Sequence, residues 1–342
     1  MTKSRTYFPA EWEKQSGVQL TWPDNQTDWV TALDEVLAVY ERIAKEILTR
    51  EKLLIVCRSK KELPAFLKEE KTNLIIREMP INDTWARDHS AITVIEDGNP
   101  VLLDFCFNGW GMKFAACHDN QITRNLHRSG AFSKDIALRD YTWFIFEGGA
   151  IESNREGCLL TTSTCLLSKN RNEHLERDEV DLFLKKTLHA EKLIWLDHGF
   201  LEGDDTDSHI DTLARFCSPD TIAYVKCSKP GDIHFEELKK MEEELRAATN
   251  QHGEPFKLVA LPFPDPVYEA DGHRLPATYA NFLILNNAVL LPVYGVKQDA
   301  DALKVMESLF PERKIIPVNS VPLIKQHGSI HCISMQFPEG VL

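Results

Sequence analysis

Long apolar runs are absent from this sequence of 342 residues. No stretch approaches the roughly 20 consecutive apolar residues that a membrane-spanning helix requires. The basic residues near the start, Lys3 and Arg5, are not followed by the apolar core of a signal peptide. We therefore expect a cytoplasmic protein that makes no contact with a membrane. Hydrophobic residues still make up 43% of the chain, which is enough for a buried core.

Closely spaced cysteines are absent too. The eight cysteines are scattered, and none belongs to a Cys-x-x-Cys pair. In a chain of this length such scatter is typical of reduced thiols in a cytoplasm, and it argues against a disulfide framework or a zinc site. We therefore expect neither a metal nor a cofactor. The cysteines are Cys57, Cys106, Cys117, Cys158, Cys165, Cys217, Cys227 and Cys332.

Positive charge is scarce, because 39 basic residues face 52 acidic ones and the formal net charge is −13. Proteins that bind nucleic acid carry basic patches or stripes, so this balance argues against a nucleic-acid partner. A negative field weakly favours a cationic substrate. Low-complexity segments and obvious linkers are also absent, and we expect a single compact domain over residues 1–342.

Apolar periodicity predicts an α/β protein with regularly spaced helices. In residues 31–50 the apolar side chains recur at i, i+3, i+4 and i+7, as on an amphipathic helix. Further helices are predicted with several short strands between them. Apart from a longer first interval, the helix centres lie about 60 residues apart, which suits five propeller-like units closing a ring. The predicted helices span 31–50, 119–130, 174–189, 235–249 and 299–310.

The stretch from Gly203 to Phe216 contains the clearest candidate for a functional centre. It begins as an acidic, Gly-led loop and then alternates between polar and apolar residues. If residues 209–216 form a strand, His209 and Asp211 share one face about 7 Å apart. A general acid or base then lies beside an anchor for a cation. A solvated acidic loop with a surface histidine accounts for the stretch equally well, whereas the positions that an EF-hand reserves for Gly and Glu hold other residues.

The candidate nucleophile is Cys332, in the stretch Gly328-Ser-Ile-His-Cys-Ile-Ser. Most cysteines in apolar strands are inert packing residues, but a Gly-Ser entry precedes this one and polar residues interrupt its apolar run. We predict a strand over 329–336, in which His331 points to the opposite face and is structural rather than a base for the thiol. The catalytic histidine must then come from elsewhere in the fold, and His209 is the best candidate.

Two further stretches place carboxylates beside predicted strands. Asn82–Ser90 combines Asp83 and Asp88 with an arginine and a tryptophan, and Phe146–Glu152 places Glu147 before two glycines. The Gly-Gly pair allows the backbone to turn tightly or to approach another group closely. Each stretch alone also has an ordinary explanation, as an exposed ion pair of little value or as a loop carboxylate.

Together these stretches supply one thiol, one imidazole and at least three carboxylates. Several carboxylates bind a cation, and a planar guanidinium is the cation best matched to them. A thiolate that attacks the guanidinium carbon releases ammonia and leaves a covalent thiouronium, which water then converts to a ureido product. The imidazole acts first as acid and then as base. Surrounding carboxylates should raise the pKa of the Cys332 thiol, and a bound guanidinium should lower it.

The ordered motifs of the chain resemble the agmatine deiminase family, a branch of the guanidino-group-modifying enzymes. The resemblance implies the α/β five-bladed pentein propeller, with pseudo-five-fold repeats around a central active site. It also implies hydrolysis of agmatine to N-carbamoylputrescine and ammonia, without a metal or cofactor, in a homodimer that serves polyamine synthesis or nitrogen recovery. The motifs are Leu20-Thr-Trp-Pro, Asn82-Asp-Thr-Trp-Ala-Arg-Asp, Glu147-Gly-Gly, Asp204-Asp-Thr-Asp-Ser-His-Ile-Asp, Tyr279-Ala-Asn-Phe and Ile330-His-Cys-Ile.

The resemblance also implies a role for each residue at a matching position. Cys332 is the nucleophile, His209 the general acid/base, and Glu147 the partner of His209 or of the substrate. The residues that bind the substrate are then Asp88 and Asp211, which grip the guanidinium, and Trp85 and Asn281, which shape the pocket. Two loops depart from the family pattern, at His327-Gly-Ser and after Glu147-Gly-Gly, and both concern the far end of the substrate.

Other functions share this chemistry or this fold. Arg87 and Arg155 lie near the motifs, and either can serve the carboxylate of arginine or peptidyl-arginine. An amidinotransferase forms the same thiouronium but passes it to an amine. A pentein that only binds a partner needs neither the thiol nor the imidazole, and the presence of both favours a catalyst.

Overall fold

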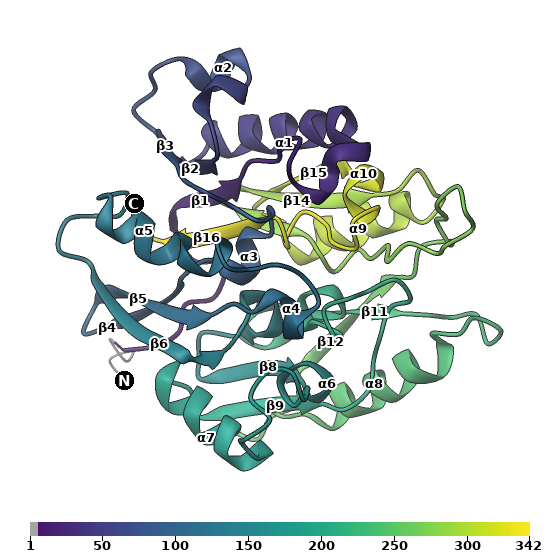
Figure 1. Ribbon diagram of the computed structural model, residues 1–342. Coiled ribbons are helices and arrows are strands. Elements are labelled where there is room, and N and C mark those ends of the chain that lie inside the picture. The colour runs from purple at the N-terminus through teal and green to yellow at the C-terminus, as the bar shows by residue number, and fades with distance from the viewer. Residues whose placement is uncertain (1–5) are drawn as a thin grey trace.

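The computed structural model describes residues 6–342 (Figure 1). Helices alternate with small β-sheets along this range, so the protein is a mixed α/β structure as predicted. The expectation for the start of the chain, that no signal-peptide core follows Lys3 and Arg5, concerns residues that lie partly outside the described range. Within that range, none of the helices combines the length and the apolar character needed to cross a bilayer.

One pairing pattern recurs in five sheets of the described residues. In each sheet a central strand pairs antiparallel with one neighbour and parallel with another. Parallel neighbours require a long crossover, and a helix lies in every one of these crossovers. The first sheet has a fourth strand, which pairs parallel with the third.

The strands of the five sheets, in spatial order, have the following bounds. The first sheet contains β16 (Ser334–Pro338), β1 (Gln15–Thr21), β2 (Lys52–Cys57) and β3 (Leu74–Glu78); the second, β4 (Ile92–Glu96), β5 (Asn99–Cys106) and β6 (Ala137–Ile145); the third, β7 (Glu152–Ser153), β8 (Cys158–Thr162) and β9 (Lys192–Leu196); the fourth, β10 (Ala214–Ser218), β11 (Thr221–Lys226) and β12 (Lys257–Pro262); and the fifth, β13 (Leu283–Leu285), β14 (Ala288–Val293) and β15 (Lys314–Asn319).

The helices of the five crossovers confirm the five predicted from periodicity. They are α1 (Leu33–Leu48), α5 (Ile122–Arg128), α7 (Arg177–Thr187), α8 (Phe235–Ala247) and α9 (Asp299–Leu309). One-turn helices connect other elements: α2 (Ala65–Lys68), α3 (Ala86–His89), α4 (Gly109–Met112), α6 (Ser163–Leu166) and α10 (Val321–Ile324). The 3₁₀ turns are η1 (Asp28–Thr31), η2 (Lys60–Glu62), η3 (Asp119–Gln121), η4 (Gly148–Ala150) and η5 (Ile210–Thr212).

Helix α1 shows why the periodicity was informative. Val36, Tyr40, Ile43 and Ile47 lie one turn apart and are fully buried. The Tyr40 ring meets the edge of Trp22, just beyond β1, with ring centroids 5.6 Å apart. Burial of such an apolar stripe supplies most of the stability of a surface helix.

The first sheet joins the two ends of the chain. Strand β16 pairs antiparallel with β1, so that Leu20 lies opposite Ser334, and Figure 1 shows the two strands side by side. The turn that carries Cys332 directly precedes β16. The candidate nucleophile is thereby fixed by a strand from the opposite end of the sequence.

Two predicted strands are wrong at their starts. Residues 209–213 do not extend β10, because Asp207 and Ser208 have positive φ angles and η5 closes on the carbonyl of His209. Residues 330–333 form a turn before β16, in which the Ser334 N–H donates to the carbonyl of His331. In both places the alternation of polar and apolar residues reflects two buried polar side chains in a turn rather than the two faces of a strand.

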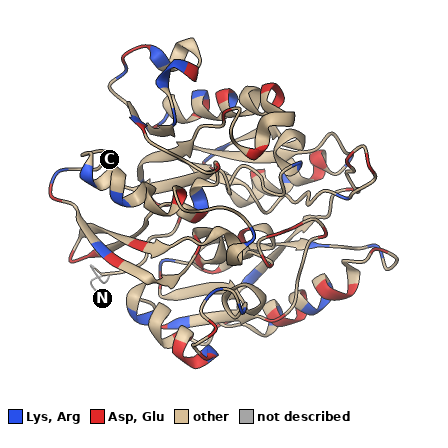
Figure 2. Ribbon diagram, viewed as in Figure 1, with Lys and Arg blue, Asp and Glu red and all other residues tan. Residues whose placement is uncertain are grey.

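Charged residues lie on the outer helices and also on loops and strands (Figure 2). Figure 2 shows acidic and basic residues on α7, and the sequence of α8 also contains both kinds. Ion pairs such as Arg177–Asp197, with both side chains over 40% exposed, contribute little to stability. Buried charges have a larger effect on stability.

Candidate active site

The imidazole of His209 lies at the centre of a buried group of carboxylates. It is fully buried, its Nδ1 is 3.7 Å from Asp88 Oδ1, and its Nε2 is 3.9 Å from Glu147 Oε2. These separations exceed hydrogen-bond length but still allow strong attraction to a charged ring. Burial lowers the pKa of His209, but Asp88 and Cys165 outweigh it and hold this pKa well above its usual value. The ring is therefore a proton donor in the free protein.

Gly149 has no side chain, and this leaves room for His209 and Asp88 beside its backbone. Its N–H donates to Asp88 Oδ1 over 2.9 Å. A Cβ at this position would lie 2.5 Å from His209 Nδ1 and 2.9 Å from Asp88 Oδ1, closer than side-chain atoms approach. The close approach expected at the Gly-Gly pair is confirmed. The groups that approach the backbone of Gly149 are the side chains of His209 and Asp88.

Asp88 projects from α3, and His209, at 3.7 Å, is its ion-pair partner among the described residues. Trp110 Nε1 donates to its Oδ2 over 3.0 Å, and sequence reasoning missed this tryptophan. Burial raises the pKa of Asp88 to about 6, against the opposing effect of His209. Asp211 and Glu147 contribute to this rise, so this carboxylate carries negative charge that the protein only partly compensates.

Glu147 differs because a buried arginine compensates it. Arg171 Nε lies 3.0 and 2.9 Å from the two oxygens of Glu147, and its Nη1 donates to Asp207 over 2.6 Å. Burial opposes ionisation, but Arg171 and His209 lower the pKa of Glu147 to about 2. Sequence reasoning missed Arg171, which stands in a loop outside every motif.

Asn281 holds the turn that carries Cys332. Its Oδ1 accepts the backbone N–H of His331 over 3.0 Å, and its Nδ2 lies 3.2 Å from Cys332 Sγ. The thiol is 4% exposed and 3.7 Å from Asp211 Oδ2. Burial, followed by Asp211 and Asp88, raises the pKa of Cys332 well above its usual value. The thiol is therefore protonated at neutral pH before any ligand binds.

Asp211 lies on η5 and contacts both Cys332 and His331. Its Oδ2 is 2.7 Å from Nδ1 of His331, and His331 in turn reaches Glu11, a residue that sequence reasoning also missed. Burial raises the pKa of Asp211, but His331 and His209 outweigh it and lower the pKa below its usual value. The prediction that His331 points to the face opposite Cys332 is wrong, because the turn directs its ring towards Asp211 Oδ2, the oxygen that also lies beside the Cys332 thiol.

A pocket of about 380 Å³ leads to Cys332 and Asp88. Trp85, Trp110 and Phe114 supply its aromatic walls, and Gly328 packs so closely on Trp85 that a Cβ there would lie 2.1 Å from the indole. Asp28, Asp83 and Asp205 also line it. Burial, then Asp28, raises the pKa of Asp83 to about 8. The pocket therefore combines aromatic rings with carboxylates along its length.

Cations of the protein already occupy the two places where ligand atoms are grouped closely enough for a metal among the described residues. In the group Glu147, Cys165 and His209, Arg171 contacts the carboxylate. In the group Glu11, Glu152 and His331, Arg215 pairs with both carboxylates. Guanidinium groups thus supply the positive charge at both places.

Comparison with known proteins identifies the family of the chain. Residues 7–338 match the model of the family described as Porphyromonas-type peptidyl-arginine deiminase. The chain belongs to this family.

Individual proteins related to the peptidyl-arginine deiminase family resemble the chain over nearly its whole length. A putative arginine deiminase of Porphyromonas gingivalis is 49% identical with a TM-score of 0.93, and covers 98% of this chain and 99% of its own. A Cys-to-Ser variant of the agmatine deiminase of C. jejuni, with substrate bound, is 37% identical with a TM-score of 0.91, over 98% and 97% of the two chains. A putative agmatine deiminase of a Marinomonas strain is 31% identical over 97% of this chain and 94% of its own.

We predict that Arg171→Met strongly destabilises the protein, because it leaves the Glu147 carboxylate buried without a partner. The free energy of unfolding in urea should fall by about 3–5 kcal/mol at neutral pH. Because the pKa of Glu147 is depressed from an unfolded value near 4.5 to about 2, the ion pair contributes fully above pH 4.5 and is lost as pH falls towards 2. The destabilisation should therefore shrink on acidification.

The matched control is Arg177→Met, the same substitution at the exposed pair with Asp197. It should change the free energy of unfolding by less than about 1 kcal/mol. Equal effects of the two substitutions would show that the buried ion pair contributes no more to stability than the exposed one.

Proposed function

We propose that this protein is an agmatine deiminase, which hydrolyses the guanidinium of agmatine to N-carbamoylputrescine and ammonia. The observation that carries the proposal is a buried thiol and imidazole, with Asp88 and Asp211 beside them, at the end of a pocket lined by carboxylates and aromatic rings. Among the described residues that line this pocket there is no lysine or arginine. The names of the C. jejuni and Marinomonas proteins support the same activity.

In this proposal Asp88 and Asp211 accept N–H bonds from the guanidinium and place its carbon near Cys332 Sγ. The thiolate attacks that carbon and forms a C–S bond. His209 then gives a proton to the departing nitrogen, and the C–N bond breaks to release ammonia. The thiouronium remains on Cys332. His209, now neutral, takes a proton from water, whose oxygen attacks the same carbon, and the ureido product leaves as the thiol is restored.

The charges around Cys332 determine when its thiol ionises. In the free protein the pKa of Cys332 is raised by burial and by Asp211 and Asp88, so the thiol is unreactive. A guanidinium bound between those carboxylates neutralises them and attracts the thiolate, so the thiol releases its proton to solvent as the substrate binds. Binding of substrate therefore creates the nucleophile, and Glu147 supports His209 through the charge that Arg171 keeps ionised.

The pocket favours agmatine over arginine. Agmatine carries an amine at its far end, which remains cationic at neutral pH. The carboxylates of Asp28 and Asp205 attract an ammonium and repel the α-carboxylate of arginine, and Asp83 adds to this effect where it is ionised. Arg87 does not line this pocket and instead pairs with Glu11 on the other side of His331. Arg155 pairs with Glu13 and is likewise not among the residues that line it.

We propose that the five repeated sheets close a five-bladed pentein propeller around the site, and that residues 1–342 form one catalytic domain. The pairing of β1 with β16 supports such a closure. We also propose a cytoplasmic homodimer, with no metal or cofactor, that acts in polyamine synthesis. The thiol, imidazole and carboxylates favour this hydrolase over a binding protein, and transfer to an amine in place of water is the amidinotransferase alternative.

We predict rapid release of ammonia from agmatine and much slower release from arginine and from a peptidyl-arginine. Cys332→Ala should lower the rate by about 10³-fold or more, because no other group replaces the nucleophile. An ammonia assay on purified protein measures all three substrates. Preference for arginine would retain the chemistry and overturn the assignment of the pocket, whereas silence on all three with folded protein would overturn the proposed hydrolase.

We predict that Asp83 binds the distal ammonium of agmatine. Because its pKa is about 8, much of this carboxyl is protonated at pH 7, and ionisation should strengthen binding as pH rises from 7 to 9. The KM for agmatine should therefore fall over this range relative to Asp83→Asn. At pH 9 the variant should bind about tenfold more weakly, the size expected for one charge-assisted hydrogen bond.

The control is Asp178→Asn, which removes a carboxylate exposed on α7. Its KM should match that of the wild type at every pH. A wild-type to Asp83→Asn ratio of KM that is constant with pH would show that Asp83 does not contact the substrate.

A further inference from the structure

His331 lies between two carboxylates on the side of the site away from the substrate pocket. Its Nδ1 is 2.7 Å from Asp211 Oδ2 and its Nε2 is 2.7 Å from Glu11 Oε1. The ring is fully buried. A neutral imidazole has a single N–H, so two such contacts with ionised carboxylates need one further proton. Burial, followed by Arg215 and Arg87, lowers the pKa of His331, and the contacts with Glu11 and Asp211 oppose that shift.

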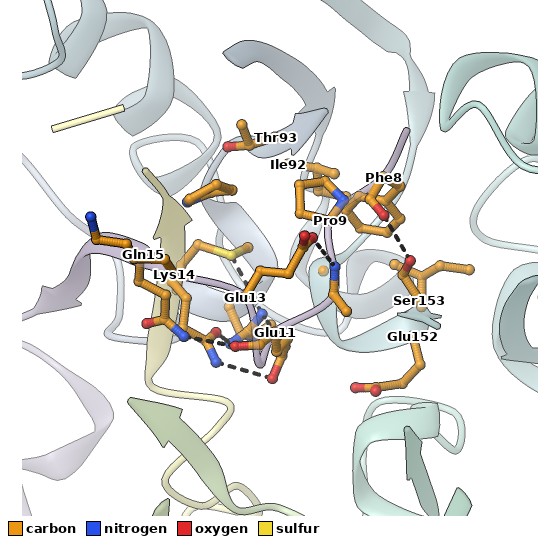
Figure 3. A pocket seen from close by; sticks show the side chains of 17 residues that line it. Phe8, Pro9, Glu11, Glu13, Lys14, Gln15, Ile92, Thr93, Glu152 and Ser153 are labelled. Carbon is orange, nitrogen blue, oxygen red and sulfur yellow. Dashed lines mark hydrogen bonds and ion pairs between the residues drawn. The ribbon is translucent and has the colours of Figure 1, made fainter. Parts of the chain in front are cut away.

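Glu11 is the fixed end of this row. Arg87 Nη1 donates to it over 3.0 Å, Gln336 Nε2 donates over 3.0 Å, and Arg215 forms a close ion pair with it. Burial opposes ionisation, but Arg215, His331 and Arg87 hold the pKa of Glu11 well below its usual value. Figure 3 shows Glu11 beside Glu13 and Gln15 in the wall of a second pocket of about 620 Å³.

Asp211, at the other end of this row of three residues, lies beside the Cys332 thiol. His331 holds its Oδ2, the oxygen that lies 3.7 Å from Cys332 Sγ. Its other oxygen, Oδ1, is buried and has no hydrogen-bond partner among the described residues. Oδ2 is thus held by the protein, whereas Oδ1 lacks a hydrogen-bond donor among the described residues.

We propose that Glu11 and His331 are positioning residues for Asp211, with Glu11 orienting the imidazole and His331 donating to Oδ2 so that Oδ1 faces the substrate. The inference rests on the proposed function, in which Asp211 binds the guanidinium. The His331 ring is bonded to the Asp211 carboxylate over 2.7 Å. The charged groups that face Asp211 are His209, His331, Arg215, Asp88 and Cys332, and those that face His331 are Glu11, Asp211, Arg87 and Arg215.

Two substitutions at His331 separate its two contacts. The amide of Asn occupies the place of Nδ1, so His331→Asn keeps a donor to Asp211 and loses the contact with Glu11. The amide of Gln reaches the place of Nε2, so His331→Gln keeps the contact with Glu11 and loses the donor to Asp211. Both variants remove the aromatic ring from the same buried position, and their difference reports the Asp211 contact.

We predict that His331→Gln raises the KM for agmatine by about tenfold or more relative to His331→Asn, as expected when a carboxylate loses one hydrogen bond. The pH profile should differ as well. Asp211 must be ionised to bind a cation, and activity is lost as pH falls through its pKa. Loss of the donor raises that pKa, so the acid limb of kcat/KM should move to higher pH in His331→Gln and less in His331→Asn.

Glu11→Gln should raise the KM for agmatine by less than His331→Gln does, because it weakens the orientation of the imidazole but leaves the contact of His331 with Asp211 in place. The matched control is Glu13→Gln, in the same segment, since Glu13 pairs with Arg155 rather than with this row. It should leave KM and the pH profile unchanged. Unfolding in urea identifies any variant that fails to fold, and the comparison then rests on the variants that do.

Equal KM values and pH profiles for His331→Asn and His331→Gln would overturn the inference, because their effects would then follow stability alone. A wild-type protein that turns over no guanidino compound would overturn the proposed function, and this inference with it. Wild-type turnover combined with equal variants would overturn the inference only.

Discussion

Buried negative charge is the constraint on which this structure depends. Carboxylates taken out of water are costly unless cations or N–H groups compensate them. Arg171 compensates Glu147, Arg215 compensates Glu11 and Glu152, and His331 supports Asp211. Asp88 is bonded only by the N–H groups of Trp110 and Gly149 among the described residues, with His209 at a longer distance. The site thus retains negative charge that a planar cation from solution is suited to complete.

The backbone makes that arrangement possible at a few positions. Gly149 admits His209 and Asp88 to contact distance of the main chain, and Gly328 admits the indole of Trp85. Two short turns, at η5 and before β16, direct Asp211 and His331 towards each other. Asn281 bonds the second of these turns through two backbone N–H groups. The reactive groups therefore stand on turns, and the repeated sheets fix where those turns lie.

Sequence reasoning reached the helices because their apolar residues recur with a period that has one physical origin, the burial of one face. It selected His209, Cys332 and Glu147 as candidates because each stands in a stretch of unusual composition. It gave the wrong backbone for 209–213 and 330–333, where polar residues alternate with apolar ones inside buried turns. It missed Arg171 and Glu11, because an ion pair between residues far apart in sequence leaves no local pattern; Glu11 and His331 are separated by 320 positions.

The claim that the substrate cation creates the nucleophile follows from the same charge balance. Its most direct test is the pH titration of the Cys332 thiolate by ultraviolet absorbance, as the difference between the wild type and Cys332→Ser, with and without a small alkylguanidinium that is not turned over. The account predicts no thiolate at neutral pH in the free protein and a lower apparent pKa of Cys332 when the cation is bound. A thiolate already present at neutral pH without ligand, or a pKa that the cation does not move, would contradict it.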